Sequence, residues 1–319
     1  MIQMGVSEIL VTGGAGFIGS HLVDQLVDLG HKVTVVDNFS TGKRSNLSKS
    51  ESKIKVVELD ISGSYETLAS ILNDNFSAIF HLACHPRQHC FKDPWRDLDV
   101  NVKSTISILE LALRNKAKVL YSSNSGIYGV GEGRLPIDET FSDAPTTPYD
   151  VHKLASEHEI QVYNKTYGIP AIIFRFATVY GPRQMPTPNW KPVIAEFTDR
   201  LLRGESPDIW GDGESTRDFI YVSDIVNALI SALNVETDVQ PIILSTNHEV
   251  SINSIYNMVN TIISSNIKPN YSEAKPGEIR RMLLDNSRAK KILGWTPKVD
   301  VENGLRKVVE WTRSEKKAS

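Results

Sequence analysis

Six short apolar runs alternate with amphipathic segments through the first 180 residues of the chain. The runs are rich in Val and Ile and too continuous for strands with one wet face, which is typical of strands covered on both sides. Between them, residues 17–29 and 99–114 repeat apolar side chains at three- or four-residue steps and predict helices. This alternation predicts an α/β fold with a doubly wound parallel sheet. The predicted strands are 8–13, 32–38, 55–61, 78–83, 118–123 and 171–181.

The alternation stops after residue 181. The stretch GPRQMPTPNWKP has four prolines in twelve residues, so it predicts neither a regular helix nor a central strand. We therefore expect one domain over residues 1–180 and a smaller, mixed C-terminal part over 181–319, with segments that cross back to the first domain.

The composition and charge of the chain argue against several classes of binding partner. The net charge is −3 without a long block of one sign, so no charge pattern indicates nucleic acid or an anionic membrane. No apolar run approaches the roughly 18 residues of a membrane span, and the N-terminus leads directly into a strand rather than a secretory signal. Two cysteines in 319 residues do not make a disulfide framework. We expect a reduced, cytoplasmic protein.

A glycine-rich turn joins the first predicted strand to the first predicted helix. In TGGAGFIGSHL, Gly13, Gly14, Gly16 and Gly19 fit both G-x-x-G-x-x-G and G-x-G-x-x-G. Such a turn lets the backbone approach a pyrophosphate, and the helix N-terminus offers free N–H groups to the anion. Asp37 ends the second strand 18 residues after Gly19, where a carboxylate accepts hydrogen bonds from ribose hydroxyls. The set predicts a Rossmann-type dinucleotide site.

The charge of Asp37 disfavours a 2′-phosphate, so NAD is preferred to NADP. Lys43 and Arg44 lie nearby in the sequence and weaken that preference.

Tyr149 and Lys153 lie four residues apart in YDVHK, on one face of a predicted helix. An ammonium close to a phenol favours the phenolate and lowers its pKa. Such a phenolate takes a proton from a sugar hydroxyl while hydride leaves the same carbon. Tyr271 and Lys275 have the same spacing, but Pro276 follows them in a predicted loop.

Together these motifs resemble the extended short-chain dehydrogenase/reductase family, and within it the NAD-dependent nucleotide-sugar epimerases and dehydratases. The similarity covers nearly the whole chain and includes DNFSTGKRSN, HLA, SSNSGIYG, YDVHK, RFATVYGPRQ and GDGESTRDFIYVSD. The resemblance implies that the C-terminal part binds a nucleotide sugar, and the expected one is a UDP-sugar.

The resemblance also implies individual contacts. The cofactor-binding residues would be Gly13, Gly16, Phe17, Ile18, Gly19, Asp37, Asn38, Ser40, Thr41, Gly42, Asp60, Ile61, Leu82, Ala83, Asn101, Ser122, Tyr149, Lys153 and Ala177. The substrate-binding residues would be His85, Ser125, Thr178, Asn189, Arg217 and Arg280, with guanidinium groups suited to the diphosphate.

Asn124 departs from the family pattern. The fifth strand of these relatives ends with a Ser or Thr that hydrogen-bonds the reacting sugar hydroxyl, and here that position is Asn124. An amide also donates and accepts hydrogen bonds. We hypothesise that Asn124 or Ser125 contacts the sugar; the alternative is that Asn124 merely caps the loop.

The residues after Asn124 favour one reaction. The 4,6-dehydratases of this family carry Asp-Glu there and the uronate decarboxylases a Glu at the second position, whereas this chain has Ser125-Gly126. Without those carboxylates, removal of a proton from carbon has no evident base. A 4-epimerase, which oxidises and reduces one carbon, is therefore expected. Another dehydratase, decarboxylase or reductase, and a non-catalytic dinucleotide-binding protein, are the alternatives.

Two further features bear on ligands and assembly. The segment HLACHPRQHC gathers three histidines and two cysteines, but its first part matches the family's fourth strand end, so we expect no metal. The helices near 99–114 and after Tyr149 pair across a two-fold axis in relatives, so the resemblance implies a homodimer.

Overall fold

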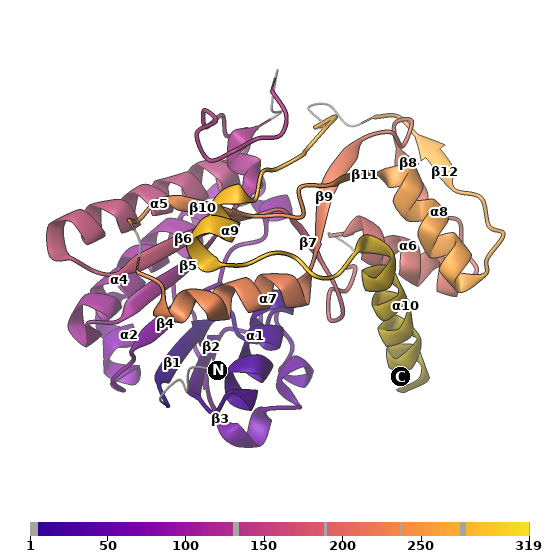
Figure 1. Ribbon diagram of the computed structural model, residues 1–319. Helices are drawn as coiled ribbons and strands as arrows, with labels where there is room; N and C mark the ends of the chain where they lie inside the picture. The colour runs from indigo at the N-terminus through magenta and orange to yellow at the C-terminus, as the bar shows by residue number, and fades with distance from the viewer. Residues whose placement is uncertain (1–5, 130–133, 188–189, 237, 275–278, 319) are drawn as a thin grey trace. The chain divides into compact units, whose positions relative to one another are not determined.

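The computed structural model describes residues 6–129, 134–187, 190–236, 238–274 and 279–318, and within these the expected α/β sheet is confirmed (Figure 1). The chain forms two compact units. The first comprises 1–127, 145–175 and 226–242, and the second 128–144, 176–225 and 243–319.

The first unit carries the large sheet. Its seven strands are ordered β10-β6-β5-β4-β1-β2-β3, and the pairs from β5 to β3 run parallel. This is the strand order of a dinucleotide-binding sheet. The strands are β1 (Glu8–Thr12), β2 (Lys32–Asp37), β3 (Ile54–Glu58), β4 (Ala78–His81), β5 (Lys118–Asn124), β6 (Ala171–Phe176) and β10 (Pro241–Leu244).

Helices and short turns connect these strands. Helices α2, α4 and α5 pack together as one layer in Figure 1, and Gln25 of α1 donates to Asn227 of α7 at 3.0 Å. The helices are α1 (Phe17–Asp28), α2 (Tyr65–Ile71), α3 (Pro94–Leu98), α4 (Ser104–Asn115), α5 (Pro148–Tyr167) and α7 (Val222–Ser231). The turns are η1 (Arg44–Leu47), η2 (Glu51–Lys53), η3 (Arg87–His89), the π-helical η4 (Asp99–Lys103), η5 (Ser125–Tyr128) and η6 (Ala232–Asn234).

The second unit has two small sheets and a cluster of helices. One sheet is ordered β11-β9-β7 and the other pairs β12 with β8, while α6, α8 and α10 contact one another. The elements are β7 (Thr178–Tyr180), α6 (Val193–Leu202), β8 (Asp208–Trp210), β9 (Thr216–Tyr221), β11 (Glu249–Ser251), α8 (Ile252–Ile263), β12 (Asn270–Ser272), α9 (Ser287–Leu293) and α10 (Val301–Ala318).

One predicted strand, 171–181, is two strands in different sheets. It divides at Ala177: β6 lies beside β10 in the large sheet, whereas β7 pairs with β9 in a small sheet. The apolar run is continuous across this point, so sequence alone does not mark the break. Strand β10 was not predicted in the large sheet either.

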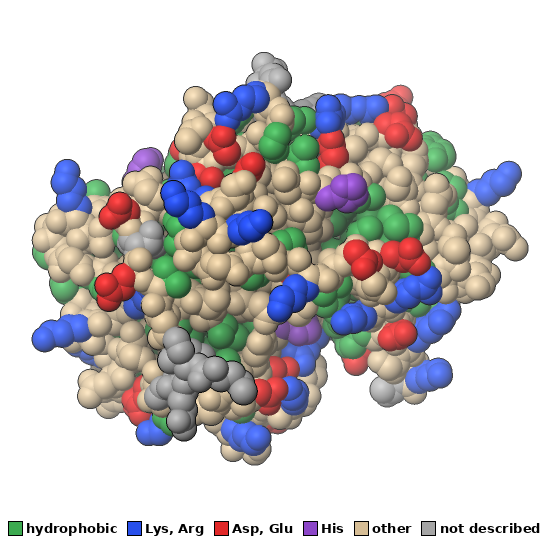
Figure 2. Space-filling view, in the orientation of Figure 1, with side chains coloured by type: hydrophobic (Ala, Val, Ile, Leu, Met, Phe, Trp, Pro, Cys, Tyr) green, Lys and Arg blue, Asp and Glu red, His purple; other side chains and the backbone are tan. Residues whose placement is uncertain are grey.

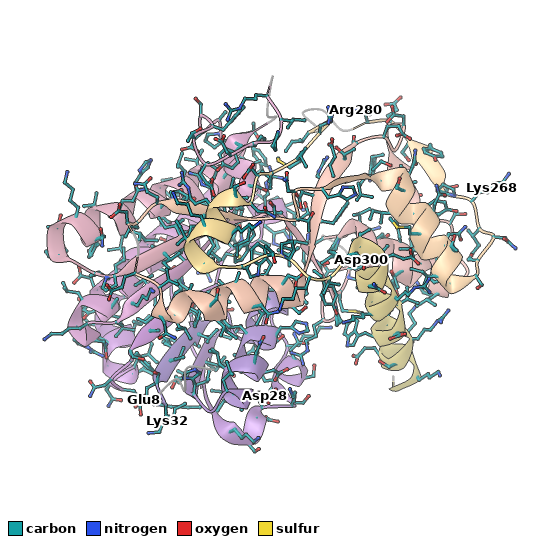
Figure 3. All side chains as sticks on the ribbon, viewed as in Figure 1. Glu8, Asp28, Lys32, Lys268, Arg280 and Asp300 are labelled. Atoms are coloured by element: carbon teal, nitrogen blue, oxygen red, sulfur yellow. The ribbon has the colours of Figure 1, made fainter. Side chains whose placement is uncertain are left out.

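The register of the sheet gathers functional residues at one edge. Glu8 faces Lys32 at the amino ends of β1 and β2, where their side chains pair at 3.1 Å (Figure 3). Parallel strands therefore place Thr12, Asp37 and His81 together at the opposite, carboxyl edge, where ligands bind in open α/β sheets.

No described helix is both long and apolar enough to cross a membrane. Blue and red side chains are interspersed on the face drawn in Figure 2.

A buried ion pair fastens α5 to the sheet. Arg175 of β6 donates to Glu157 through Nε at 3.0 Å and Nη2 at 2.7 Å, and both side chains are at most 3% exposed. Removing one partner of such a pair strongly destabilises the fold, because the other charge stays buried.

We predict that Glu157→Ala lowers the free energy of unfolding by about 3–5 kcal/mol, because it leaves the Arg175 guanidinium buried without this carboxylate. The matched control is Glu302→Ala, which removes an exposed helical partner of Arg306 and costs at most about 1 kcal/mol. Urea unfolding of both variants makes the comparison. Equal losses would contradict the role given to the buried pair.

Candidate active site

The glycine-rich turn leaves no room for a side chain at Gly13 or Gly19. Gly13 has φ +69°, and a Cβ on it would lie 2.7 Å from the Ala83 nitrogen. A Cβ on Gly19 would collide with the Gly13 carbonyl and lie 2.8 Å from the Gly14 Cα. The turn therefore brings its backbone against the segment that follows β4 and leads into α1, whose first residues are Phe17 and Ile18. Backbone N–H groups at such a helix start bind a pyrophosphate.

Asp37 ends β2, where the sequence predicts a contact to the ribose. Its Oδ2 accepts from Ala15 N at 2.9 Å and its Oδ1 from Phe39 N at 2.8 Å, which fixes the carboxylate beside the glycine turn. Burial raises the pKa of Asp37, and these two backbone hydrogen bonds oppose that shift. Each oxygen keeps a further lone pair for a ribose hydroxyl.

The loop after Asp37 packs on the same turn. Asn38 Oδ1 accepts from Ser40 N at 3.0 Å, and a Cβ on Gly42 would lie 2.9 Å from the Ala15 carbonyl carbon. Ser40 and Thr41 are exposed, and Gly42 is buried. Arg44 lies 4.9 Å from the Phe39 ring centroid and pairs with Glu58 at 3.4 Å. Its guanidinium is thus already engaged, in line with a preference for NAD.

Asp60 sits in a dense set of hydrogen bonds. It accepts from Ser62 Oγ at 2.6 Å, from Asn38 Nδ2 at 3.0 Å and from Arg96. Burial raises the pKa of Asp60, but these hydrogen bonds outweigh it and hold the pKa well below its usual range. Ile61 is buried in the core beside it. Sequence reasoning missed Arg96, which carries no motif and reaches Asp60 from α3.

A chain of hydrogen bonds fixes the protonation of His81. Thr105 Oγ1 donates to Asn101 O at 2.7 Å, so it accepts from His81 Nε2 at 3.2 Å. Thr12 Oγ1 accepts from Ala83 N at 3.3 Å and lies 2.8 Å from His81 Nδ1, to which it donates. The imidazole is therefore the neutral Nε2–H tautomer. Burial, and next the charge of Lys153, lower the pKa of His81 to about 3.

Three buried polar atoms near this edge have no hydrogen-bond partner among the described residues: Asn101 Nδ2, Ser123 Oγ and Asn124 Nδ2. The Asn101 Oδ1, by contrast, accepts from His85 N at 3.2 Å. Buried polar atoms are rarely left unpaired in proteins, so these atoms indicate a polar ligand. With the closed glycine turn and Asp37, they fit a dinucleotide.

Lys153 is a deeply buried cation of the site. It is 1% exposed, and its Nζ donates to Ser122 O at 2.8 Å. The same Nζ lies 4.7 Å from the Tyr121 ring centroid and 5.8 Å from the Tyr149 ring centroid. The helix begins at Pro148 behind the Thr147 cap, so Tyr149 and Lys153 share one face as predicted.

The pKa of Tyr149 differs from the expectation. Burial raises it well above its ordinary value, followed by the Cys84 thiol, which is hydrogen-bonded to the phenol, and by Tyr121. These effects outweigh Lys153, so the ammonium alone does not produce a phenolate. Cys84 carries no recognisable motif and was missed as a neighbour of the phenol.

The start of α5 holds a second ion pair. Asp150 is fully buried and accepts from Arg87 through Nε at 3.3 Å and Nη2 at 3.0 Å. Thr147 Oγ1 donates to the same carboxylate at 2.6 Å. A Cβ on Gly126 would collide with Asp150 Oδ1 and lie 2.5 Å from Asn124 Oδ1. This position therefore admits only glycine without a shift of its neighbours.

His85 of the segment HLACHPRQHC shares one carboxylate with His152 of α5. His85 Nδ1 lies 3.0 Å from one oxygen of the buried Asp97, and His152 Nδ1 lies 2.5 Å from the other. Within the described ranges, no three His, Cys, Asp or Glu side chains are arranged to hold a metal ion. The substrate role of His85 stays a prediction.

The second unit holds the remaining predicted residues. Arg217 Nη1 donates to Thr216 O and Ile279 O, both at 2.7 Å. Arg280, labelled in Figure 3, forms a bidentate pair with Asp212 at 2.6 and 2.9 Å. Ala177 is buried and Thr178 half-buried. Asn189 and Lys275 lie outside the described residues.

Comparison with known proteins agrees with this geometry. The model of the NAD-dependent epimerase/dehydratase family matches residues 9–245. The chain belongs to this family. The family is NAD-dependent, so NAD is the cofactor that the glycine turn, Asp37 and Asn101 would hold.

Relatives of the NAD-dependent epimerase/dehydratase family resemble the chain over nearly its whole length. A putative UDP-glucose 4-epimerase of Methanocaldococcus jannaschii is 36% identical over 310 residues, which is 96% of this chain and 98% of the relative. The crystal structure of a Thermotoga maritima UDP-glucose 4-epimerase with UDP-glucose has 36% identity and a TM-score of 0.92, covering 97% and 99% of the two chains.

A third similar structure contains a different nucleotide sugar. The Bacillus cereus UDP-glucuronic acid 4-epimerase, solved with UDP-glucuronic acid and NAD, has 30% identity and a TM-score of 0.86, covering 97% of this chain and 99% of that one. The similarity supports a nucleotide-sugar epimerase whose sugar is not fixed by the comparison.

We predict that His81 makes stability depend on pH. Its folded pKa of about 3 lies below the ordinary 6.5, so the unfolded chain binds the extra proton between those values and stability falls as the pH drops below 6.5. In His81→Gln this contribution is absent. Urea unfolding at pH 6 and pH 5 should show a loss about 1 kcal/mol larger in the natural protein than in the variant. Parallel pH profiles would contradict the assignment.

Proposed function

We propose that this protein is an NAD-dependent 4-epimerase of UDP-hexoses or UDP-hexuronates. The observation that carries the proposal is the pairing of Tyr149 with the buried Lys153 at the end of β5, beside a cradle that fits NAD. Bound NAD supplies the acceptor, and later the donor, of a hydride.

The protein's own residues perform the proton transfer. Tyr149 takes the proton of the C4 hydroxyl and later returns it, which makes it both general base and general acid. Lys153 stabilises the phenolate that the transfer requires, from a position fixed by Ser122 O. Either Asn124 or Ser125 contacts the sugar.

The surroundings of Gly126 favour this reaction over proton removal from carbon. Position 126 is glycine, and a side chain there would collide with Asn124 and Asp150. A carboxylate that could serve as the base therefore does not fit at this position without a shift of its neighbours. The neighbouring Asp150 is fully buried and engaged by Arg87 and Thr147, which makes it unsuited to act as a base.

The remaining assignments follow the family resemblance. Arg217, Arg280 and Asn189 would contact the diphosphate, and His85 and Thr178 the sugar. We also propose a cytoplasmic homodimer that pairs through α4 and α5.

The reaction is tested with purified protein and no added cofactor. UDP-glucose, UDP-GlcNAc and UDP-glucuronate are incubated separately, and products are identified by NMR. We expect at least one to be converted to its C4 epimer without net NADH. Net consumption of NAD(P)H would instead identify a reductase, and release of CO₂ would identify a decarboxylase.

We predict that Tyr149→Phe lowers kcat by about 10²–10⁴-fold, because the phenol is the general base and acid. Bound NAD, measured after denaturation, should stay at the level of the natural protein. The matched control is Tyr163→Phe, which removes a phenol from the same helix where it donates to Glu110 and should leave kcat unchanged. A fully active Tyr149→Phe variant would disprove the assignment of the base.

A further inference from the structure

The amide of Asn124 has one defined orientation. Gly126 N lies 2.6 Å from Asn124 Oδ1. A backbone N–H can only donate, so the atom that faces it must be the amide oxygen. The NH₂ group therefore points away from this turn. Gly126 preserves the arrangement, because a Cβ there would lie 2.5 Å from the same oxygen.

The NH₂ group of Asn124 lacks a protein partner. Asn124 Nδ2 is buried and has no hydrogen-bond acceptor in the part of the chain that the structure describes. An unpaired buried donor is costly, and a ligand acceptor removes that cost. The NH₂ group is thus the part of the amide left to face a ligand, because the oxygen is turned towards Gly126 N.

This donor lies near the reacting groups. Asn124 ends β5 two residues after Ser122, whose carbonyl oxygen holds the Lys153 ammonium. Its oxygen and the Asp150 carboxylate both border position 126, and Asp150 follows Tyr149 in α5. We infer that a sugar oxygen that reaches Tyr149 comes within reach of the Asn124 amide.

We propose that Asn124 is a donor-only contact to the reacting sugar oxygen, so that the site binds the 4-keto sugar more tightly than the 4-hydroxyl sugar. The inference rests on the proposed epimerase and deepens it. A Ser or Thr hydroxyl at this position both donates and accepts, and would serve the two forms of the sugar more equally.

The chemistry of the oxidation explains the preference. In this oxidation the hydroxyl proton would pass to the Tyr149 phenolate, bound NAD⁺ would accept the C4 hydrogen as hydride, and the C–O bond would become double. The hydroxyl oxygen donates and accepts, whereas the ketone oxygen only accepts. A fixed N–H donor orients the hydroxyl proton towards Tyr149 and meets the negative charge that grows on the oxygen. Tighter binding of the ketone also keeps it in place until hydride returns.

The test uses binding, so that it does not depend on turnover. Tyr149→Phe protein loaded with NAD is titrated calorimetrically with a UDP-4-keto-6-deoxyhexose and with the matching 4-hydroxyl sugar. We expect the keto sugar to bind more tightly. Adding Asn124→Ser should reduce this preference about fivefold, and Asn124→Asp, which keeps the acceptor for Gly126 N but replaces the NH₂ donor with a carboxylate oxygen, should reduce it by at least about tenfold.

Three outcomes overturn the inference. They are equal affinity for the two sugars, an unchanged preference in both Asn124 variants, and loss of the preference in Ser125→Ala instead. NAD content and circular dichroism check that each variant is folded.

Failure of the epimerase proposal is recognised separately. NMR on the natural protein reports epimerisation without reference to Asn124, so absent turnover with an intact keto preference would refute the reaction but retain the contact. Turnover with no preference would refute the contact alone.

Discussion

The buried ammonium of Lys153 is the interaction on which the site depends. A charge that is 1% exposed is tolerated only when its surroundings solvate it, and here a carbonyl oxygen and two aromatic rings do so. Because Ser122 O is the acceptor, the ammonium ties α5 to the end of β5. The Arg175–Glu157 pair fastens the same helix one turn further on, so the positions of Tyr149 and Lys153 are set by two buried charges.

The pKa of Tyr149 links proton transfer to the cofactor. Burial, Cys84 and Tyr121 all raise it, so Lys153 does not by itself make a base at neutral pH. An oxidised nicotinamide held beside the phenol would add positive charge there, whereas a reduced one would not. The phenol is then a stronger proton acceptor when the cofactor can take hydride and a better donor once the hydride has been taken. Because the phenol can both accept and donate this proton, it suits a reaction that runs in both directions.

Much of the fold and the cofactor cradle could be predicted because the signals are local. The glycine turn, Asp37 and the Tyr149–Lys153 spacing each lie within one short segment or one strand–helix unit. Arg96, Thr105 and Asp97 could not be found in this way, because they are ordinary residue types whose partners are distant in sequence. The split of 171–181 was missed for a related reason: β6 and β7 pair with strands of different sheets, β10 and β9, which only the folded chain brings near.

The departure at Asn124 is best understood together with its neighbours. The oxygen of Asn124 accepts from Gly126 N, the lack of a side chain at Gly126 leaves room for Asp150, and the buried Asp150 is hydrogen-bonded by Arg87. A single substitution at any of these positions disturbs the other contacts, so their effects will not be additive. A change of reaction type in this chain, such as a carboxylate at position 126, would therefore require several of these residues to change together.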